Sequence, residues 1–132
     1  MGVIKPGMTI SDFGSGSGYF TIPMAKLVGK DGKVYAFDVL KDALEALKSK
    51  AELAGLFNIE TRRVNLEKSE ATGLNDQSQD CVVLSNILFQ SQKKEEMLTE
   101  AKRILKPDKY LIVVAWEPDT AVGPSEGWRI SR

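Results

Sequence analysis

The sequence has no histidine and only one cysteine, Cys81, among its 132 residues. The missing histidines exclude Ser/His and Cys/His nucleophilic catalysis and most zinc sites. A single cysteine excludes an internal disulfide and suits a reducing cytoplasm, and we expect Cys81, in an apolar run, to be a small buried hydrophobe. No apolar run approaches the roughly 20 residues that span a bilayer, so we expect neither a membrane segment nor a signal peptide.

An excess of charge of one sign is also lacking, because 18 basic residues balance 18 acidic ones. Binding nucleic acid through bulk electrostatics needs a basic face, so no nucleic-acid partner is expected. The sequence contains no repeat, no low-complexity stretch and no interior linker, and its length fits one domain. We therefore expect residues 1–132 to form a single globular domain that ends in a tail over 117–132.

Hydrophobic periodicity alternates between strand and helix patterns along the chain. The helix over 42–55 is the clearest element, because Leu44, Leu47, Ala51 and Ala54 form one apolar stripe. Strands that alternate with helices predict parallel βαβ units and a doubly wound α/β sheet with flanking helices. The expected strands are 9–13, 34–37, 59–64, 81–84 and 110–116, and the expected helices are 19–28, 42–55 and 91–107.

A glycine-rich loop lies between the first expected strand and the first expected helix. Glycine recurs there at every second position, at Gly14, Gly16 and Gly18, and glycine permits positive φ and the close approach of a ligand. Asp38 ends the next strand, 20 residues beyond Gly18, from where a carboxylate can accept both ribose hydroxyls of a nucleoside. The alternative, a tight turn with a surface aspartate, is disfavoured because strand, glycines, helix and acid agree in order and spacing.

The spacing of the glycines separates two classes of nucleoside cofactor. Dinucleotide folds use G-x-G-x-x-G, whereas here the third glycine lies two positions after the second, and Tyr19 follows it. The pattern D-x-G-x-G-x-G over 12–18 resembles the first motif of the class I S-adenosylmethionine-dependent methyltransferases. The stretches 5–12, 74–86 and 100–111 are similar to further motifs of that family. The similarity is greatest to its small-molecule branch, which includes quinone-biosynthesis C-methyltransferases.

The resemblance implies a Rossmann-like fold that binds S-adenosylmethionine and releases S-adenosylhomocysteine. The implied sheet is mainly parallel, has five strands in the order 3-2-1-4-5, and lacks the family's C-terminal antiparallel strands, since only 16 residues follow the fifth strand. The implied cofactor residues are Asp12, Gly14, Ser15, Gly16 and Gly18 at the amino-acid part, Asp38 at the ribose, Val39, Asn65 and Leu66 at the adenine, and Ser85 beneath the sulfonium. The stretch 65–74 is longer than the usual pattern, so Ser69 or Glu70 is an alternative for the adenine.

The implied activity is methyl transfer from S-adenosylmethionine to a small-molecule acceptor by in-line displacement. Ser85, Asn86 and Gln90 are the candidates on the acceptor side; no general base is identified, and no metal is expected. The alternative is a non-catalytic module or subunit that binds S-adenosylmethionine or S-adenosylhomocysteine. The apolar strand 110–116 is expected at a sheet edge. We expect this edge to be covered either by a homodimer or by the tail 117–132 folding back.

Overall fold

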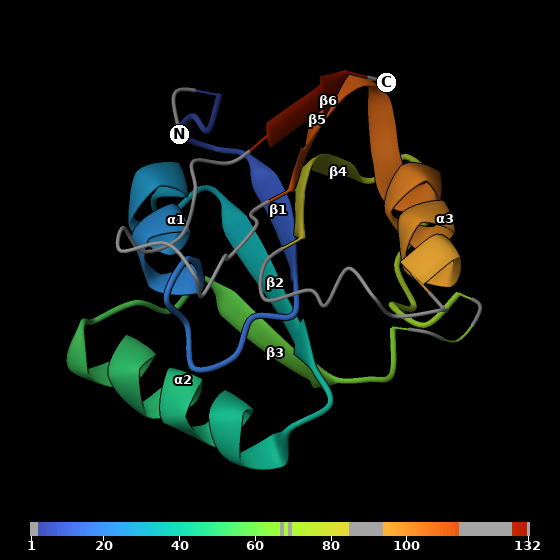
Figure 1. Cartoon of the computed structure of the whole chain (residues 1–132). Coiled ribbons are helices and arrows are strands. Elements are labelled where there is room, and N and C mark those ends of the chain that lie inside the picture. Colours follow the sequence, from blue (N-terminus) through green and yellow to red (C-terminus); the bar gives the residue numbers. More distant parts are fainter. Residues whose placement is uncertain (1–2, 67, 69, 85–93, 114–127, 132) are drawn as a thin grey trace, which may run out of the picture.

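The computed structural model describes residues 3–66, 68, 70–84, 94–113 and 128–131, which form one sheet with helices on both faces (Figure 1). Strand and helix alternate up to β3, and α3 separates β4 from β5, as the periodicity predicts. In chain order the elements are β1 (Thr9–Phe13), α1 (Thr21–Val28), β2 (Lys33–Asp38), α2 (Lys41–Leu53), β3 (Ile59–Arg63), β4 (Gln79–Leu84), α3 (Lys94–Ile104), β5 (Leu105–Val113) and β6 (Trp128–Ser131).

The sheet has the strand order β3-β2-β1-β4-β5-β6. Neighbouring strands from β3 to β5 are parallel, and Ile10 of β1 lies opposite Val34 of β2 and Cys81 of β4. The predicted order of the first five strands is therefore confirmed. Parallel pairing brings the carboxyl ends of these strands to one edge of the sheet, where open α/β sheets bind their ligands.

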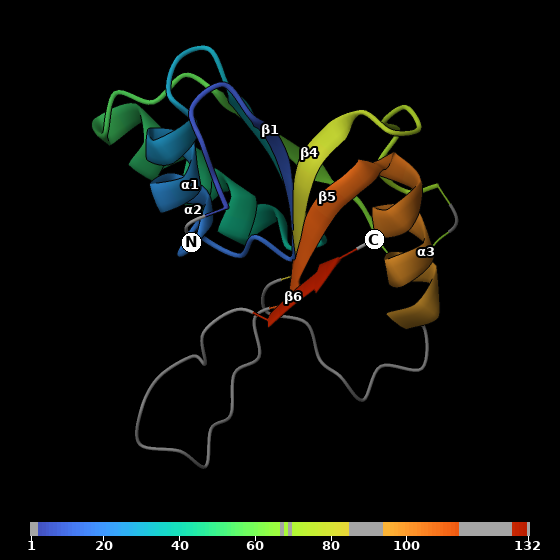
Figure 2. The same cartoon turned by 90° about the horizontal axis from the view of Figure 1, so that it is seen from above.

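The prediction that C-terminal antiparallel strands are lacking is wrong, because β6 pairs with β5 in the antiparallel direction. The strand β6 lies beside β5 (Figure 2), and the register places Trp128 opposite Val113 and Ser131 opposite Tyr110. Residues 128–131 of the tail thus fold back on the chain's own edge strand, which is one of the two outcomes that the sequence predicts. The predicted homodimer needs the same edge, and β6 occupies it.

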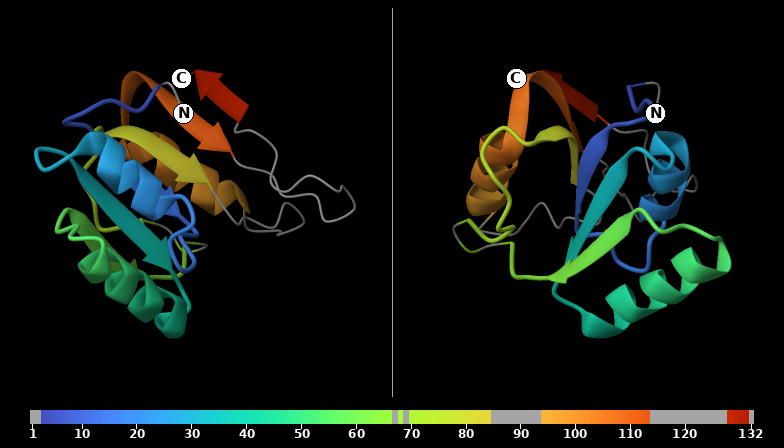
Figure 3. Two further views of the ribbon diagram at one scale, coloured as in Figure 1. Left: turned by 90° about the vertical axis from the view of Figure 1, so that its left-hand side faces the viewer. Right: turned by 180° about the vertical axis from the view of Figure 1, so that it is seen from behind.

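The helices divide between the two faces of the sheet, with α1 and α2 on one face and α3 on the other (Figures 2 and 3). Met24 and Val28 of α1 pack against Val83 and other side chains of the first face. The cluster on the second face joins α3 to the sheet and includes Phe13, Phe37, Val82, Leu84, Met97, Ala101 and Ile104. In the described part of the chain, no helix is long and apolar enough to cross a membrane.

Several helix boundaries differ from the sequence prediction. The third helix ends at Ile104 rather than at residue 107, because residues 105–107 belong to β5, which begins earlier than the predicted residue 110. The first helix begins at Thr21 rather than at residue 19, which places Pro23 in the first turn, where its missing N–H breaks no helical hydrogen bond. The second helix ends at Leu53, so Ala54 is exposed rather than part of the buried stripe. The rest of that stripe is buried as predicted, at Leu44, Leu47 and Ala51.

We expect a chain that ends at residue 127 to be less stable than the full chain and to self-associate. Without β6, the N–H and C=O groups along the edge of β5 have no strand partner, and such an edge pairs with other chains. Thermal unfolding should show a midpoint lower by about 3 °C or more, and sedimentation velocity should show dimers of the shortened chain only. An unchanged midpoint together with a monomeric shortened chain would contradict a role for β6 in protecting this edge.

Candidate functional site

The loop predicted to bind a ligand lies at the carboxyl edge of the sheet, between β1 and α1 (Figure 1). The strand β1 lies between β2 and β4, and the helices α1 and α3 cover opposite faces of the sheet. This arrangement is a topological switch point, the place where ligands bind in open parallel sheets. The segments that follow β1, β2 and β3 therefore form one end of the molecule.

Three consecutive N–H groups of the glycine loop donate hydrogen bonds to the end of β2. The carbonyl oxygen of Phe37 accepts from Gly14 N at 2.9 Å and from Ser15 N at 3.0 Å. The carboxylate Oδ2 of Asp38 accepts from Gly16 N at 2.8 Å. Gly14 and Gly16 have φ values of 80° and 55°, in the left-handed region that favours glycine. The loop is thus held against β2 in a conformation that side chains other than glycine rarely adopt.

The carboxylate of Asp38 is oriented from both sides by backbone N–H groups. Its Oδ2 accepts from Gly16, and its Oδ1 accepts from Leu40 N at 3.0 Å. A carboxylate offers about four lone-pair sites, two on each oxygen. Asp38 is only partly buried, and these two bonds leave it further acceptor capacity. The residue predicted to hold a ribose therefore has the position and the lone pairs for that role.

Ser15 in the loop and Asp12 of β1 beneath it are both buried, but they differ in their hydrogen bonding. The side chain of Ser15 is 1% exposed, and its Oγ has no hydrogen-bond partner among the described residues. A buried hydroxyl without a partner is costly, so a polar ligand group at this place would satisfy it. Asp12 is fully buried and accepts a hydrogen bond from Thr21 Oγ1 at 2.7 Å. Asp12 thereby anchors the first residue of α1 to β1.

Gly18 is required by the packing of the loop on α2. Its φ is 103°, and a Cβ atom at this position would lie 2.4 Å from Leu47 Cδ1. Leu47 is fully buried, so it has little room to move away. A second contact joins the same two elements, because Lys50 Nζ donates to Ser17 Oγ at 3.2 Å. The packing of the loop on α2 therefore explains the third glycine of the motif without any ligand.

The segment after β3 lies beside Asp38. Val64 N donates to the carbonyl oxygen of Asp38 at 3.0 Å, and Arg63 Nε donates to the carbonyl oxygen of Val39 at 3.0 Å. These bonds place the predicted adenine residues Asn65 and Leu66 directly after a backbone contact with the predicted ribose acid. The Leu66 side chain is 6% exposed and packs in the α3-side core.

Two apolar side chains lie at the site, of which the sequence predicted one, Val39, and not the other, Leu40. Val39 is 49% exposed and Leu40, which the motif did not indicate, is 62% exposed. Both follow Asp38 directly at the end of β2, so they offer apolar surface next to its carboxylate. Glu70, the alternative adenine residue, is exposed with a φ of 51°. Other predicted residues lie outside the described part of the chain: Ser69, Ser85, Asn86 and Gln90.

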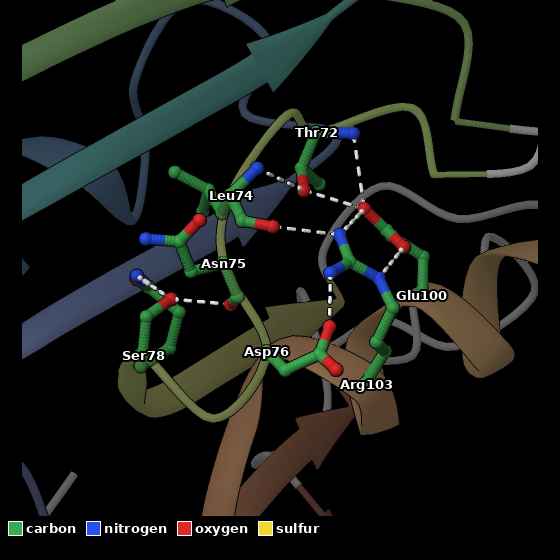
Figure 4. Close-up of polar contacts among 8 residues, drawn as sticks. Thr72, Leu74, Asn75, Asp76, Ser78, Glu100 and Arg103 are labelled. Atoms are coloured by element: carbon green, nitrogen blue, oxygen red, sulfur yellow. Dashed lines mark hydrogen bonds and ion pairs between the residues drawn. The ribbon is translucent and has the colours of Figure 1, made fainter.

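A polar network that the sequence did not indicate fastens the segment before β4 to α3 (Figure 4). Glu100 accepts hydrogen bonds from the N–H and the hydroxyl of Thr72 and from Nε and Nη2 of Arg103. Arg103 also donates to the carbonyl oxygen of Leu74 at 2.8 Å and to Oδ1 of Asp76 at 2.6 Å. The network therefore joins two stretches that are far apart in the chain.

Both charges of the Glu100–Arg103 pair are stabilised by their partners. Burial raises the pKa of Glu100, but the hydrogen bonds from Arg103 and Thr72 together outweigh burial and hold the pKa below its usual range. The hydrogen bond with Glu100 is the main reason why the pKa of Arg103 lies above its usual range. The Glu100 side chain is 2% exposed and the Arg103 side chain is 22% exposed, so this is a partly buried ion pair whose carboxylate is ionised at neutral pH.

Cys81 is the buried hydrophobe that the sequence predicts. Its side chain is 1% exposed in the middle of β4. Burial, followed by the negative charges of Asp12 and Asp80, raises the pKa of the thiol to about 12. Since the thiolate is the nucleophilic form, Cys81 is not a nucleophile at neutral pH.

A parallel α/β sheet with a glycine loop after its first strand and an acid after its second is typical of Rossmann-like proteins that bind nucleoside cofactors. A sequence model of the methyltransferase domain matches residues 4–121, and the chain belongs to this family. The family predicted from the motifs is thereby confirmed.

Among curated proteins, the chain is similar to the ubiquinone/menaquinone biosynthesis C-methyltransferase UbiE of Escherichia fergusonii. The two are 30% identical over 112 residues, which cover 84% of this chain and 43% of that protein. The chain thus spans less than half the length of the curated relatives it matches.

Two solved structures share the fold at similar sequence identity. A SAM-dependent methyltransferase from Aquifex aeolicus has a TM-score of 0.77 and 31% identity, covering 91% of this chain and 64% of that one. An arsenic(III) S-adenosylmethionine methyltransferase from Chlamydomonas reinhardtii has a TM-score of 0.75 and 30% identity, covering 85% of this chain and 39% of that one. The family's fold is therefore present in the chain from β1 to β5.

We expect Asp38→Ala to release the Gly16 amide, because the substitution removes the carboxylate oxygen that accepts from this N–H. Hydrogen exchange of the Gly16 amide, followed by NMR, should accelerate about tenfold or more, as expected for a lost bond to a charged group. Asp38→Asn keeps one oxygen acceptor and should give a smaller change. Asp42→Ala, an exposed acid in the first turn of α2, is the matched control. Equal exchange rates in Asp38→Ala and Asp42→Ala would contradict the described loop.

The network makes a second prediction, about pH. At pH 7 we expect Glu100→Gln to lower the free energy of unfolding by about 1–3 kcal/mol, since a buried carboxylate loses its charge-assisted bonds. The pKa of Glu100 is lower in the folded state than in the unfolded chain. Its contribution is therefore complete above the unfolded pKa, about 4.3, and is lost as the pH falls through the folded pKa. Urea unfolding should show that the difference in free energy of unfolding between the wild type and Glu100→Gln decreases between pH 7 and about pH 3. A constant advantage over this range would contradict the assignment.

Proposed function

We propose that the chain binds S-adenosylmethionine at the glycine loop and transfers its methyl group to a small-molecule acceptor. The observation that carries this proposal is the hydrogen-bonded unit of loop and Asp38 at the positions that the family motif requires. The names of the relatives support the choice of cofactor and of reaction class.

The residues present fit this cofactor at three points. The unpartnered hydroxyl of Ser15, between Gly14 and Gly16, suits a polar group of the amino-acid part, with Gly18 and Asp12 shaping the loop around and beneath it. The remaining lone pairs of Asp38 suit the ribose hydroxyls. We assign the adenine to the apolar surface of Val39 and to Asn65 and Leu66, which follow the contact between Val64 and Asp38, and keep Ser69 or Glu70 as the alternative.

The protein's part in the reaction is binding and orientation. S-adenosylmethionine supplies a methyl group on a positively charged sulfur, which is already a reactive electrophile. The chain has to hold the acceptor in line with that methyl group, and orientation of this kind is worth roughly 7–11 kcal/mol. We propose Ser85, Asn86 and Gln90, after the carboxyl end of β4, for the acceptor side. No histidine base is needed where the acceptor is an acidic carbon, a thiol or an already ionised group.

The amino-acid composition supports our proposals for the class of acceptor and for the cellular compartment. The balanced charge supports a small molecule rather than nucleic acid as the partner. One buried, free cysteine is compatible with a reducing compartment, and we propose the cytoplasm. A non-catalytic module that binds the same cofactor is the alternative, because such a module would use the same cofactor residues.

Titration calorimetry with S-adenosylmethionine, S-adenosylhomocysteine and NAD tests the proposal. We expect binding of the first two and not of NAD. Asp38→Ala should weaken binding roughly ten- to a hundredfold, because a hydrogen bond to a charged group contributes about 1.5–3 kcal/mol. Asp42→Ala should leave the affinity unchanged. Equal affinity in wild type and Asp38→Ala would remove the ribose assignment.

Gly16→Val should abolish binding, because a β-branched side chain resists a φ of 55° and fills the space where the loop meets the ligand. Gly55→Val is the matched control, since Gly55 has a φ of 69° at the end of α2, with open space around it. Both variants should lose stability, but only Gly16→Val should lose affinity in its folded fraction. A screen of thiols, phenols and quinones then separates the enzyme from the non-catalytic module, which transfers no methyl group to any of them.

A further inference from the structure

Thr72 is fixed between β3 and α3 by every polar group that it has. Its N–H and its hydroxyl donate to Glu100 of α3, and its hydroxyl also accepts from Leu74 N at 3.1 Å. Its carbonyl oxygen accepts from Arg62 Nη1 of β3 at 2.8 Å. Thr72 is also 2% exposed, so its place is fixed relative to both β3 and α3.

The segment after β3 is therefore held at both of its ends. At its start, Val64 donates to the carbonyl oxygen of Asp38. At its end, Thr72 is bonded to Arg62 and Glu100 (Figure 4). Asn65 and Leu66 lie just inside the first attachment, and the side chains of Leu66 and Leu74 share one core cluster. A displacement of Thr72 would consequently be transmitted to the residues assigned to the adenine.

Four hydrogen bonds meet at the carboxylate of Glu100. Its Oε2 accepts from Thr72 N, Thr72 Oγ1 and Arg103 Nη2, and its Oε1 accepts from Arg103 Nε. Burying a carboxylate is also an expensive way to attach a helix, since apolar residues of similar volume often do so more cheaply. The apolar face of α3 already packs on the sheet through Ala101 and Ile104. What the bonds from Thr72 to Glu100 add is a fixed place for the segment at Thr72.

We propose that Glu100 and Arg103 are positioning residues for the adenine-binding segment, so that recognition of the adenine base depends on two α3 side chains that do not touch the cofactor. The inference rests on the proposed function, because it takes the ligand to be an adenosine compound. Arg103 donates hydrogen bonds to Glu100, to the carbonyl oxygen of Leu74 and to Asp76, so the turn before β4 is fastened to α3.

The test compares two ligands that differ only in the base. S-adenosylhomocysteine and S-inosylhomocysteine, in which an oxygen replaces the adenine amino group, are titrated against each variant by calorimetry. We expect the wild type to bind the adenine compound about tenfold or more tightly, which corresponds to the contribution of one hydrogen bond. Glu100→Gln should lower this preference at least about threefold, because the segment loses its fixed position while the glycine loop and Asp38 are unchanged.

A matched pair of variants separates positioning from folding. Thr72→Val removes the hydroxyl and should lower the preference as Glu100→Gln does, whereas Thr72→Ser keeps the hydroxyl and should retain it. Val28→Ala destabilises the opposite face of the sheet, since Val28 is 1% exposed in the α1-side core, and should leave the preference unchanged. If Glu100→Gln fails to fold, Thr72→Val provides the same readout.

Each outcome decides between the claims. A lower preference in Glu100→Gln and Thr72→Val but not in Thr72→Ser and Val28→Ala supports the positioning role. An unchanged preference in Thr72→Val, or a wild type that binds both compounds equally, overturns it and leaves the proposed function intact. A wild type that binds neither compound contradicts the proposed function, and this inference falls with it.

Discussion

The hydrogen bonds between the glycine loop and the end of β2 are the contacts on which the site depends. Phe37 and Asp38 accept from three consecutive N–H groups of the loop, so the loop and the acid form one unit. Because Leu40 holds the other oxygen of Asp38, the carboxylate is oriented before any ligand arrives. A preformed acceptor of this kind reduces the ordering cost of binding. Loop conformation and ligand affinity are therefore linked through one carboxylate.

The helices on the two faces of the sheet hold different segments of the candidate site. On one face, α1 and α2 hold the glycine loop, through Thr21 on Asp12 and through Leu47 beneath Gly18. On the other face, α3 holds the segment between β3 and β4 through Glu100. Substitutions on the two faces should therefore affect different parts of the same bound molecule, the amino-acid side from α1 and α2 and the base side from α3.

Local patterns in the sequence predicted the alternating elements and the loop, because glycine spacing, an acid after a strand and alternating periodicity are all short-range signals. The strand order was implied by the resemblance of the motifs to the methyltransferase family. The tail was predicted to fold back only as one of two alternatives, and β6 was not predicted as a strand, since it has only four residues and depends on a partner strand elsewhere in the chain. The network also escaped prediction, because Thr72 and Glu100 are 28 positions apart and each alone is an ordinary polar residue. The acceptor-side residues Ser85, Asn86 and Gln90 stay a prediction from the family motif.

The central claim is that an adenosine-containing cofactor binds where the loop, Asp38 and the segment after β3 meet. Titration of the ¹⁵N-labelled chain with S-adenosylhomocysteine, followed by amide chemical shifts, tests it most directly. We predict the largest shift changes at Ser15, Gly16, Leu40 and Leu66. Changes concentrated instead at the hollow on the amino side of β2 and β3, around Gly29 and Asn58, or no change at any amide, would contradict the account.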